Sequence, residues 1–328
     1  MPGGIALLRA WVPGLVSLGL PVFNGENFIA PCIESILEQS YSNFELLISD
    51  NHSTDATSKI CQDYQRRDPR IRYIRQATNL GAARNYNLVR REARGEFFKW
   101  VAHDDLLRAD CLEESVRRLR EQPTAVLCYS AVAVIDSDGV VIHLDRAELV
   151  GTASSSPAQR FAPAVMDEHL CLGVYGVIRN ASLAGYGNYT SYDGTDRAII
   201  ARWALQGPFV YHPEPLISLR SHPGRYVRSA RANPRDVLPW WDPDLAGKTT
   251  SHTRRLLADY VHMVGQADLT AAERRQCYLL IARAALRPWM LRWVARDLVA
   301  TRPAIYERLR VWKRSLLGSW FFGRFGST

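Results

Sequence analysis

The 328-residue sequence predicts an α/β fold with a mainly parallel sheet, helices on both faces and a helical C-terminal extension. Over residues 1–135, short apolar runs alternate with segments whose apolar side chains recur at helical spacing. After residue 249 the sequence becomes helical throughout and rich in Arg, Trp and Leu. We therefore expect a main domain over residues 1–228 and a basic, aromatic-rich, mostly helical region over residues 229–328.

The first two strand–helix units are predicted from apolar runs and turn residues. Residues 16–22 form a short apolar run, and Asn24-Gly25 directly after it indicates a turn. Residues 27–39 carry apolar side chains at helical spacing. Residues 44–49 predict a second strand that ends at Asp50, and a helix over residues 56–66 follows it.

The alternation continues up to residue 144. Strands are predicted over residues 71–74, 97–101, 125–135 and 140–144, and helices over residues 82–91 and 109–120. Asn24, Asp50 and the pair Asp104-Asp105 each follow a strand. Because ligands of parallel sheets bind beyond the carboxyl ends of the strands, we expect these side chains to gather at one site.

The six cysteines are scattered and form no CxxC pair, which argues against a zinc cluster or a disulfide framework and fits a reducing cytosol. Residues 1–20 are apolar, but Arg9 and Pro13 interrupt them and no basic segment precedes them. We interpret them as a lead-in to the first strand and not as a signal peptide. No apolar run reaches the roughly 18 residues of a membrane span.

The net charge of +8 falls almost entirely on residues 249–328. Amphipathic basic helices with aromatic side chains suit an anionic membrane surface. The same composition suits a helical subdomain that packs its aromatic side chains on the main domain, so both interpretations stay open. No nucleic-acid-binding module is present. We expect a cytoplasmic protein, peripheral at the inner face of the cell membrane under the first interpretation. The residues concerned are Trp289, Trp293, Trp312, Trp320, Phe321 and Phe322, with Arg287, Arg292, Arg296, Arg308, Arg310, Lys313 and Arg314.

The pair Asp104-Asp105 at the end of a buried strand suits a divalent cation. Mg²⁺ and Mn²⁺ prefer oxygen ligands, typically one or two carboxylates together with substrate phosphates. The alternative is a helix N-cap or a solvated turn, where acidic residues are also favoured.

Five sequence blocks over residues 15–140 resemble family 2 inverting glycosyltransferases of the GT-A fold, in the family's order and at its spacing. The blocks are Pro21-Val22-Phe23-Asn24-Gly25-Glu26, residues 35–45 from Ser35 to Glu45, Ile48-Ser49-Asp50-Asn51-His52-Ser53-Thr54-Asp55, Asn79-Leu80-Gly81-Ala82-Ala83-Arg84-Asn85 and Phe98-Lys99-Trp100-Val101-Ala102-His103-Asp104-Asp105.

The resemblance implies a donor site for a nucleotide sugar. Pro21, Phe23 and Glu26 would line the pocket for the base and ribose, with Phe23 where the family often has Tyr. Asp50 would accept a hydrogen bond from the ring N–H of the base. Arg84 and Asn85 would lie beneath the donor, with Arg84 balancing phosphate charge or, alternatively, exposed on a helix.

The resemblance also assigns the cation and the base. Asp104 would contact ribose or metal and Asp105 would bind the cation, Mn²⁺ or Mg²⁺; His103 replaces the first carboxylate of the Asp-x-Asp-type motif. His222 would complete the metal shell or touch the diphosphate, with a structural histidine as the alternative, and Arg220 would help to neutralise phosphate. An inverting transfer requires a general base, for which Asp196 is the candidate and Asp193 the reserve. Asp196 as a helix N-cap is the alternative.

Together these residues imply transfer of a hexose from a UDP-, dTDP- or GDP-sugar to a hydroxyl of a glycan or lipid-linked acceptor, as in the synthesis of cell-envelope polysaccharides. Two other enzyme classes fit less well. A nucleotidyltransferase requires a Gly-rich basic loop and an NAD-dependent enzyme a GxGxxG motif after the first strand, and both are absent. A nucleotide-binding scaffold of the same fold without turnover is the remaining alternative.

Overall fold

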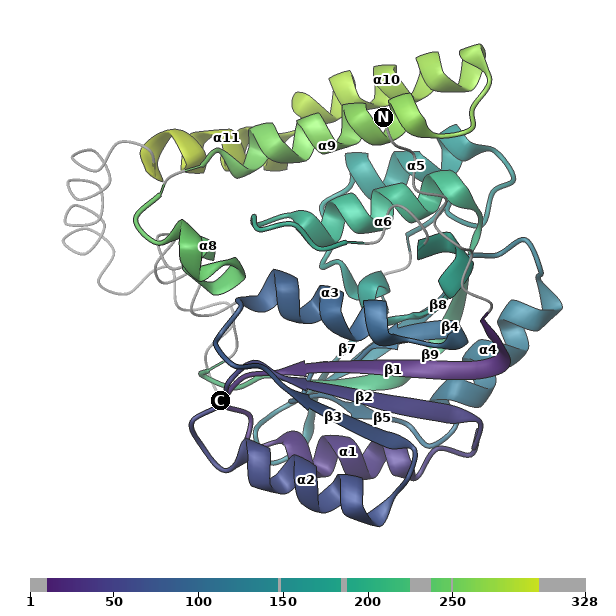
Figure 1. Ribbon diagram of the computed structural model, residues 1–328. Helices are drawn as coiled ribbons and strands as arrows, with labels where there is room; N and C mark the ends of the chain where they lie inside the picture. Colours follow the sequence, from purple (N-terminus) through teal and green to yellow (C-terminus); the bar gives the residue numbers. More distant parts are fainter. Residues whose placement is uncertain (1–10, 147–148, 184–187, 225–236, 249, 301–328) are drawn as a thin grey trace, which may run out of the picture.

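The computed structural model describes residues 11–146, 149–183, 188–224, 237–248 and 250–300 (Figure 1). The expected boundary at residue 228 lies outside these ranges. So do the first ten residues and the tail residues Arg308, Arg310, Trp312, Lys313, Arg314, Trp320, Phe321 and Phe322.

A nine-stranded mixed sheet forms the centre of the described part, in the order β3-β2-β1-β4-β8-β6-β9-β5, with β7 paired to β6. The strands β1 (Val12–Val22), β2 (Phe44–Asp50), β3 (Ile71–Arg75) and β4 (Gly95–Trp100) are parallel. β6 (Leu127–Ile135) is parallel to β9 (Phe209–Arg220). The other strands pair antiparallel, namely β5 (Leu106–Leu107), β7 (Val141–Asp145) and β8 (Val177–Arg179).

The α/β prediction is confirmed, but the sheet is less parallel than expected. The reason is that the three-residue strand β8 enters between β4 and β6 and runs antiparallel to both. Its residues lie in the segment after Gly151, whose pattern is too irregular to predict a strand. The parallel prediction holds for the first four strands, where each crossover contains a helix.

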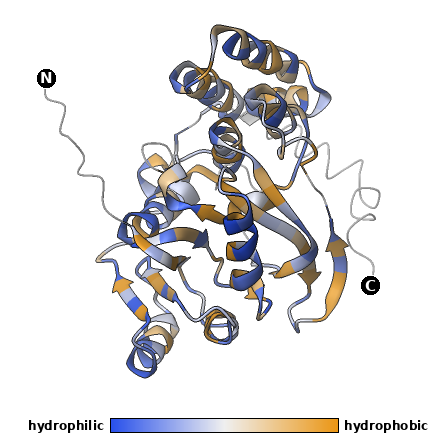
Figure 2. Ribbon diagram, turned by 90° about the vertical axis from the view of Figure 1, so that its right-hand side faces the viewer, coloured by the Kyte–Doolittle hydropathy of each residue, from blue (hydrophilic) through white to orange (hydrophobic). Residues whose placement is uncertain are grey.

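Helices cover both faces of the sheet (Figure 1). On one face, α1 (Ile29–Leu37), α2 (Thr57–Arg67) and α4 (Cys111–Glu121) bury residues such as Ile33 and Leu112. On the other face lie α3 (Ala82–Glu92), α5 (Pro157–Met166) and α6 (Thr195–Gln206). Neighbouring strand residues alternate between the two cores, as Phe97 and Phe98 do in β4. Figure 2 shows the resulting concentration of hydrophobic residues along the strands.

The C-terminal helices pack on the main domain as a third layer. They are α9 (His252–Gln266), α10 (Ala271–Ala285) and α11 (Pro288–Ala300), preceded by the short α8 (Val237–Trp241) and the 3-10 turn η4 (Pro243–Leu245). A capping box of Thr270 and Glu273 begins α10. Leu256, Tyr260 and Trp289 share one buried core with Phe161 of α5 and Trp203 of α6. None of the helices in the described ranges is both long and apolar enough to cross a membrane.

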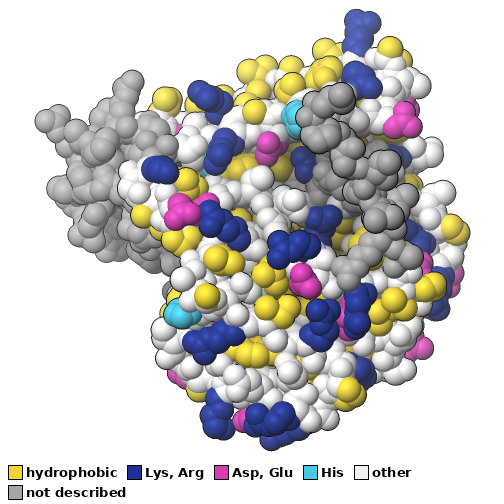
Figure 3. Space-filling model, in the orientation of Figure 1, with side chains coloured by type: hydrophobic (Ala, Val, Ile, Leu, Met, Phe, Trp, Pro, Cys, Tyr) yellow, Lys and Arg dark blue, Asp and Glu magenta, His cyan; other side chains and the backbone are white. Residues whose placement is uncertain are grey.

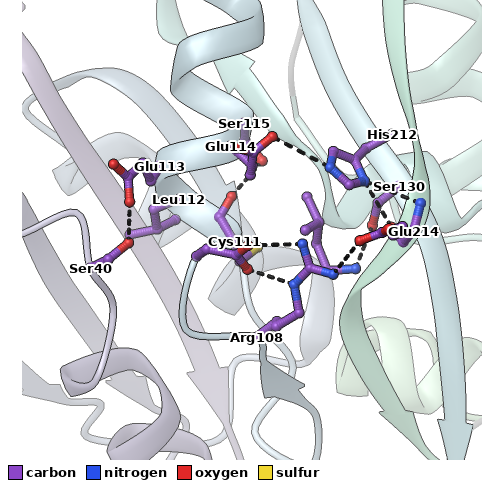
Figure 4. A network of polar contacts seen from close by, with 12 residues as sticks. Ser40, Arg108, Cys111, Leu112, Glu113, Glu114, Ser115, Ser130, His212 and Glu214 are labelled. Atoms are coloured by element: carbon purple, nitrogen blue, oxygen red, sulfur yellow. Dashed lines mark hydrogen bonds and ion pairs between the residues drawn. The ribbon is translucent and has the colours of Figure 1, made fainter.

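The strand β9 reaches from α4 to the carboxyl edge of the sheet. At its start, His212 Nε2 lies 3.4 Å from Glu114 Oε2 of α4. Arg108 Nη1 lies 3.0 Å from Glu214 Oε2 (Figure 4). The Nε of Arg108 donates a hydrogen bond to Asp110, directly before α4. These contacts help to set the register of β9. Its last residue, Arg220, then lies beside the residues that follow β4.

Candidate functional site

A cavity of about 940 Å³ opens at the carboxyl ends of the parallel strands. Pro21 and Val22 from the end of β1 and Ala102 to Asp104 after β4 form its floor. The amino end of α3, the turn before α6 and the residues after β9 surround it. The sequence predicted a site at this edge, and the cavity is there because parallel strands end together.

Asp104 and Asp105 follow β4 and are almost fully buried, with 8% and 2% exposure. Asp104 lines the cavity, and its Oδ2 lies 3.0 Å from His222 Nε2. Asp105 is not among the lining residues; its Oδ1 accepts a hydrogen bond from the Arg220 backbone N–H at 2.9 Å. Only Asp104 therefore faces the cavity, and Asp105 fastens the end of β9 to the end of β4.

His222 and Arg220 both contact the ring of Phe28. The centroid of the His222 ring and the guanidinium carbon of Arg220 each lie 4.8 Å from the Phe28 centroid. Arg220 also donates to the backbone oxygens of Asp104, Asp136 and Ser137. Arg220 is 5% exposed and absent from the lining, so it supports the site from below.

Two side chains predicted for the nucleotide pocket are turned elsewhere. Asp50 is fully buried; its Oδ2 accepts from Tyr73 Oη at 2.6 Å and its Oδ1 from the Ser53 N–H at 2.8 Å. Glu26 accepts a hydrogen bond from the Ala56 N–H at 2.8 Å, directly before α2. Neither lines the cavity, whereas Pro21 and Phe23 do, and Phe23 is 45% exposed.

Three asparagine side chains near Asp50 line the cavity, although Asp50 itself does not. Asn51 and Asn79 line the cavity and are joined by a hydrogen bond of 2.8 Å, and Asn51 Oδ1 also accepts from the Leu80 N–H. Asn85 lines the cavity too, held by Ser49 Oγ at 2.5 Å and by the Ser49 carbonyl at 3.0 Å. Asn51 and Asn79 stand in the motif blocks of the sequence, but nothing local shows which side chain of a block faces the cavity.

Arg84 points away from the cavity. Its guanidinium lies 2.8 Å from Asp244 Oδ2 and 3.3 Å from Asp242 Oδ2, and its side chain is 51% exposed. Because α3 places neighbouring residues about 100° apart, Asn85 faces the cavity while Arg84 faces α8 and η4. Of the two interpretations of Arg84, the exposed helix residue describes the structure.

Asp196 lies in the first turn of α6 and lines the cavity. Burial raises the pKa of its carboxyl to about 6; the Tyr189 hydroxyl opposes this rise and the charge of Asp193 adds to it. Gly194 directly precedes α6 with φ +105°, a conformation that favours glycine. Asp193 lines the same cavity, but its Oδ2 lies 2.9 Å from Arg296.

An aromatic wall faces the floor of the cavity. It comprises Tyr86, Tyr175, Tyr189, Trp240 and Trp241. The Trp241 and Tyr189 rings stack at 5.8 Å, and Tyr189 adjoins Asp196. The contribution of α8 was not predicted, because it depends on how a later segment packs against α3.

Divalent cations would find few protein ligands here. Within the described ranges, no three His, Cys, Asp or Glu side chains gather in a metal-binding arrangement. Asp104 and His222 together face the cavity, which suits a cation held by one carboxylate and completed by phosphate oxygens.

Comparisons with known proteins match part of this chain to one family model. The model of Glycosyl transferase family 2 matches residues 17–176. Glycosyltransferase GlyG of Streptococcus pneumoniae is 30% identical over 125 residues, 38% of this chain and 42% of that protein. The putative teichuronic acid biosynthesis glycosyltransferase TuaG of Bacillus subtilis is 32% identical over 129 residues, 39% of this chain and 50% of that protein. The chain thus spans half or less of these relatives.

Solved structures show the same fold. S. aureus TarS in complex with UDP-GlcNAc superposes with a TM-score of 0.58 at 16% identity, over 89% of this chain and 82% of that one. The mannosyltransferase PcManGT of Pyrobaculum calidifontis, in complex with GDP-Man and Mn²⁺, gives 0.53 at 17% identity, over 93% and 80%. At such identities the likeness concerns the fold alone.

Proposed function

We propose that this protein, whose residues 17–176 match the model of Glycosyl transferase family 2, transfers a hexose from a nucleotide sugar to a hydroxyl of a glycan or lipid-linked acceptor, with inversion. One observation carries the proposal. Asp104, at the carboxyl edge of the sheet, and Asp196, at the start of α6, line one cavity. Its volume of about 940 Å³ is at the upper end of those of ligand sites.

The donor occupies the side of the cavity next to β1. Phe23 offers a half-exposed ring for stacking on a base, and Asn51 and Asn79 offer amide groups for hydrogen bonds. UDP and GDP sugars are bound by the structural neighbours TarS and PcManGT. The candidate bases are uracil, guanine and thymine, each of which presents a ring N–H that an amide oxygen can accept.

Asp104 and His222 would hold a divalent cation, Mn²⁺ or Mg²⁺, with the donor phosphates supplying the remaining ligands. When bound, such a cation stabilises the negative charge that develops on the departing diphosphate. Asp105 supports this arrangement from behind, because its bond to the Arg220 N–H holds the segment that leads to His222. PcManGT, which was solved with Mn²⁺, is consistent with this assignment.

Asp196 acts as the general base. The acceptor oxygen attacks the anomeric carbon, its proton passes to an oxygen of the Asp196 carboxylate, and the bond from the anomeric carbon to the phosphate oxygen breaks with its electron pair on the diphosphate. A base is most effective when its pKa lies near the working pH. The raised pKa of about 6 meets this condition at neutral pH, where the carboxylate is ionised.

The acceptor enters from the C-terminal side, and we propose that this side meets an anionic membrane. Leu291, Val294 and Leu298 recur at helical spacing on α11 and are 51%, 37% and 56% exposed, and Leu286 before it is 74% exposed. Hydrophobic and basic side chains lie side by side where α9–α11 form the top of the molecule (Figure 3). Sedimentation with vesicles of anionic and of neutral lipids tests this, since absence of the protein from both pellets contradicts it.

A thermal-shift screen of UDP, dTDP and GDP and their sugars, each with and without Mn²⁺, tests the donor site. We expect one nucleotide series to raise the melting temperature, and to do so mainly with Mn²⁺ present. If no compound shifts the melting temperature of folded protein, the donor proposal fails. If a nucleotide binds but no sugar is released or transferred with any acceptor, the protein is a nucleotide-binding scaffold of the same fold.

A further inference from the structure

The C-terminal helices α9 and α11 make several side-chain contacts with the turn before α6. This turn, residues 191–194, leads directly to Asp196 and contains Gly194 at φ +105°. A glycine in this region is conformationally permissive, so it does not by itself fix the direction in which α6 begins. The contacts that fix it come from α9 and α11.

Three side chains of α9 hold the turn. The Asp193 backbone N–H donates to His252 Nδ1 at 2.8 Å. Tyr192 Oη donates to Asp259 Oδ2 at 2.6 Å, and Arg255 Nη1 donates to the Ser191 carbonyl at 3.2 Å. Consecutive residues of the turn are thus bound to successive turns of one helix.

Two side chains of α11 complete the arrangement. Arg296 Nη1 lies 2.9 Å from Asp193 Oδ2. The ring of Trp293 lies so close to Gly194 that an added Cβ would approach it to 3.0 Å. The helix α11 is itself tied to the start of α9, because Asp297 Oδ2 accepts from Ser251 Oγ and the Thr253 N–H at 3.0 and 2.8 Å.

Asp193 brings a second negative charge close to Asp196. Its charge favours the protonated form of Asp196, and Arg296 is the cation that pairs with it. The other titratable groups that face the two carboxylates are Tyr86 of α3, Tyr189, Cys171, and His252 and Arg255 of α9. The Arg296 pair is half-exposed, so its effect is moderate and sensitive to salt.

We propose that α9 and α11 position the general base, with Arg296 as a positioning residue that holds Asp193 and offsets its charge beside Asp196. This rests on the proposed function of Asp196. It gives the C-terminal helices a role in the reaction that is separate from contact with any membrane. Arg296 is not among the residues that line the cavity, so it acts through Asp193 and the turn.

The geometric part is tested by hydrogen exchange, without any substrate. In Arg296→Ala we expect faster exchange in peptides that cover residues 188–196, with the rest of the sheet unchanged. Arg292→Ala is the matched control, since Arg292 lies one turn earlier on α11 and pairs with exposed Glu168. Equal exchange of this segment in wild type, Arg296→Ala and Arg292→Ala overturns the proposal whether or not the protein is a transferase.

The electrostatic part is tested by pH–rate profiles with the donor found in the thermal screen. Arg296→Ala should lower kcat by about ten-fold with an unchanged KM for the donor. It should also move the midpoint of the profile upward by roughly half a pH unit. Arg296→Lys should recover most of kcat, because it keeps the charge.

A double variant separates the charge of Asp193 from a catalytic role. Asp193→Asn combined with Arg296→Ala should return the midpoint to the wild-type value or below, since the second carboxylate is then gone. An unchanged midpoint in Arg296→Ala overturns the electrostatic part. If Asp193→Asn alone abolishes turnover while Asp196→Asn does not, Asp193 is the base and the proposal is overturned. Absence of any nucleotide shift in wild type is instead a failure of the proposed function.

Discussion

His222 Nε2 lies 3.0 Å from Asp104 Oδ2, although 118 residues separate the two in the sequence. The contact joins the end of β4 to the residues after β9 at the floor of the cavity. A histidine that faces the cavity beside a carboxylate is suited to share a cation with it.

We expect His222→Ala to weaken Mn²⁺-dependent binding of the nucleotide by about ten-fold or more, as loss of a metal ligand or its close partner does. Titration calorimetry of the nucleotide at fixed Mn²⁺ measures this. His262→Ala is the control, because His262 is an exposed histidine on α9. Equal affinities in the two variants would remove His222 from the metal site.

Substitutions of the two neighbouring aspartates should have different effects, one on metal-dependent binding and the other on stability. Asp104→Asn should abolish the gain in nucleotide affinity that Mn²⁺ provides, with little loss of stability, because Asp104 faces the cavity. Asp105→Ala should lower the free energy of unfolding by about 1–3 kcal/mol, because the buried Arg220 N–H loses its acceptor. Urea unfolding together with nucleotide titration separates the effects. Metal-dependent binding that persists in Asp104→Asn but not in the folded Asp105→Ala would reverse the assignment.

Asp196→Asn should bind the donor normally and lose about 10²–10⁴-fold in turnover. In wild type the rate should rise as pH rises through about 6 and level off above it, since the base acts as the carboxylate. Rate measurements from pH 5 to pH 8 show whether the rate rises or falls with pH. A rate that falls over this range, or near-wild-type turnover in Asp196→Asn, would place the base elsewhere.

The same carboxyl group makes stability depend on pH. Its pKa is raised on folding, so it favours the folded state at pH values below its unfolded pKa and loses this contribution as pH rises through about 6. We therefore expect Asp196→Asn to melt at a higher temperature than wild type at pH 7.5, with the difference vanishing near pH 4. Paired melting curves at the two pH values measure it, and a lower melting temperature of the variant at pH 7.5 would contradict the burial argument.

Arg84→Ala should leave nucleotide affinity within about two-fold, because the guanidinium pairs with Asp242 and Asp244 outside the cavity. Nucleotide titration of this variant beside Asn85→Ala provides the comparison. Asn85 lines the cavity, so its variant should bind more weakly. A loss of affinity in Arg84→Ala as large as that in Asn85→Ala would restore the phosphate role implied by the resemblance.

The sequence alone determined the α/β class, the elements of the first four strands and the edge at which the cavity lies. These follow from hydrophobic periodicity and from turn residues, which act over a few residues. It also predicted Asp104, His222 and Asp196 as site residues, and all three line the cavity. The short strand β8 and the mixed character of the sheet were missed, since pairing between distant strands leaves little local signal.

Only the tertiary structure decided which way the side chains of those blocks point. Asp50 is turned to Tyr73, Glu26 to the start of α2 and Arg84 to a segment 158–160 residues later. In the same way, the ion pair between Arg296 and Asp193 in the turn before Asp196 joins residues about a hundred positions apart. Such contacts depend on how complete helices pack on one another, and that packing is set by the whole buried surface and not by any short stretch of sequence.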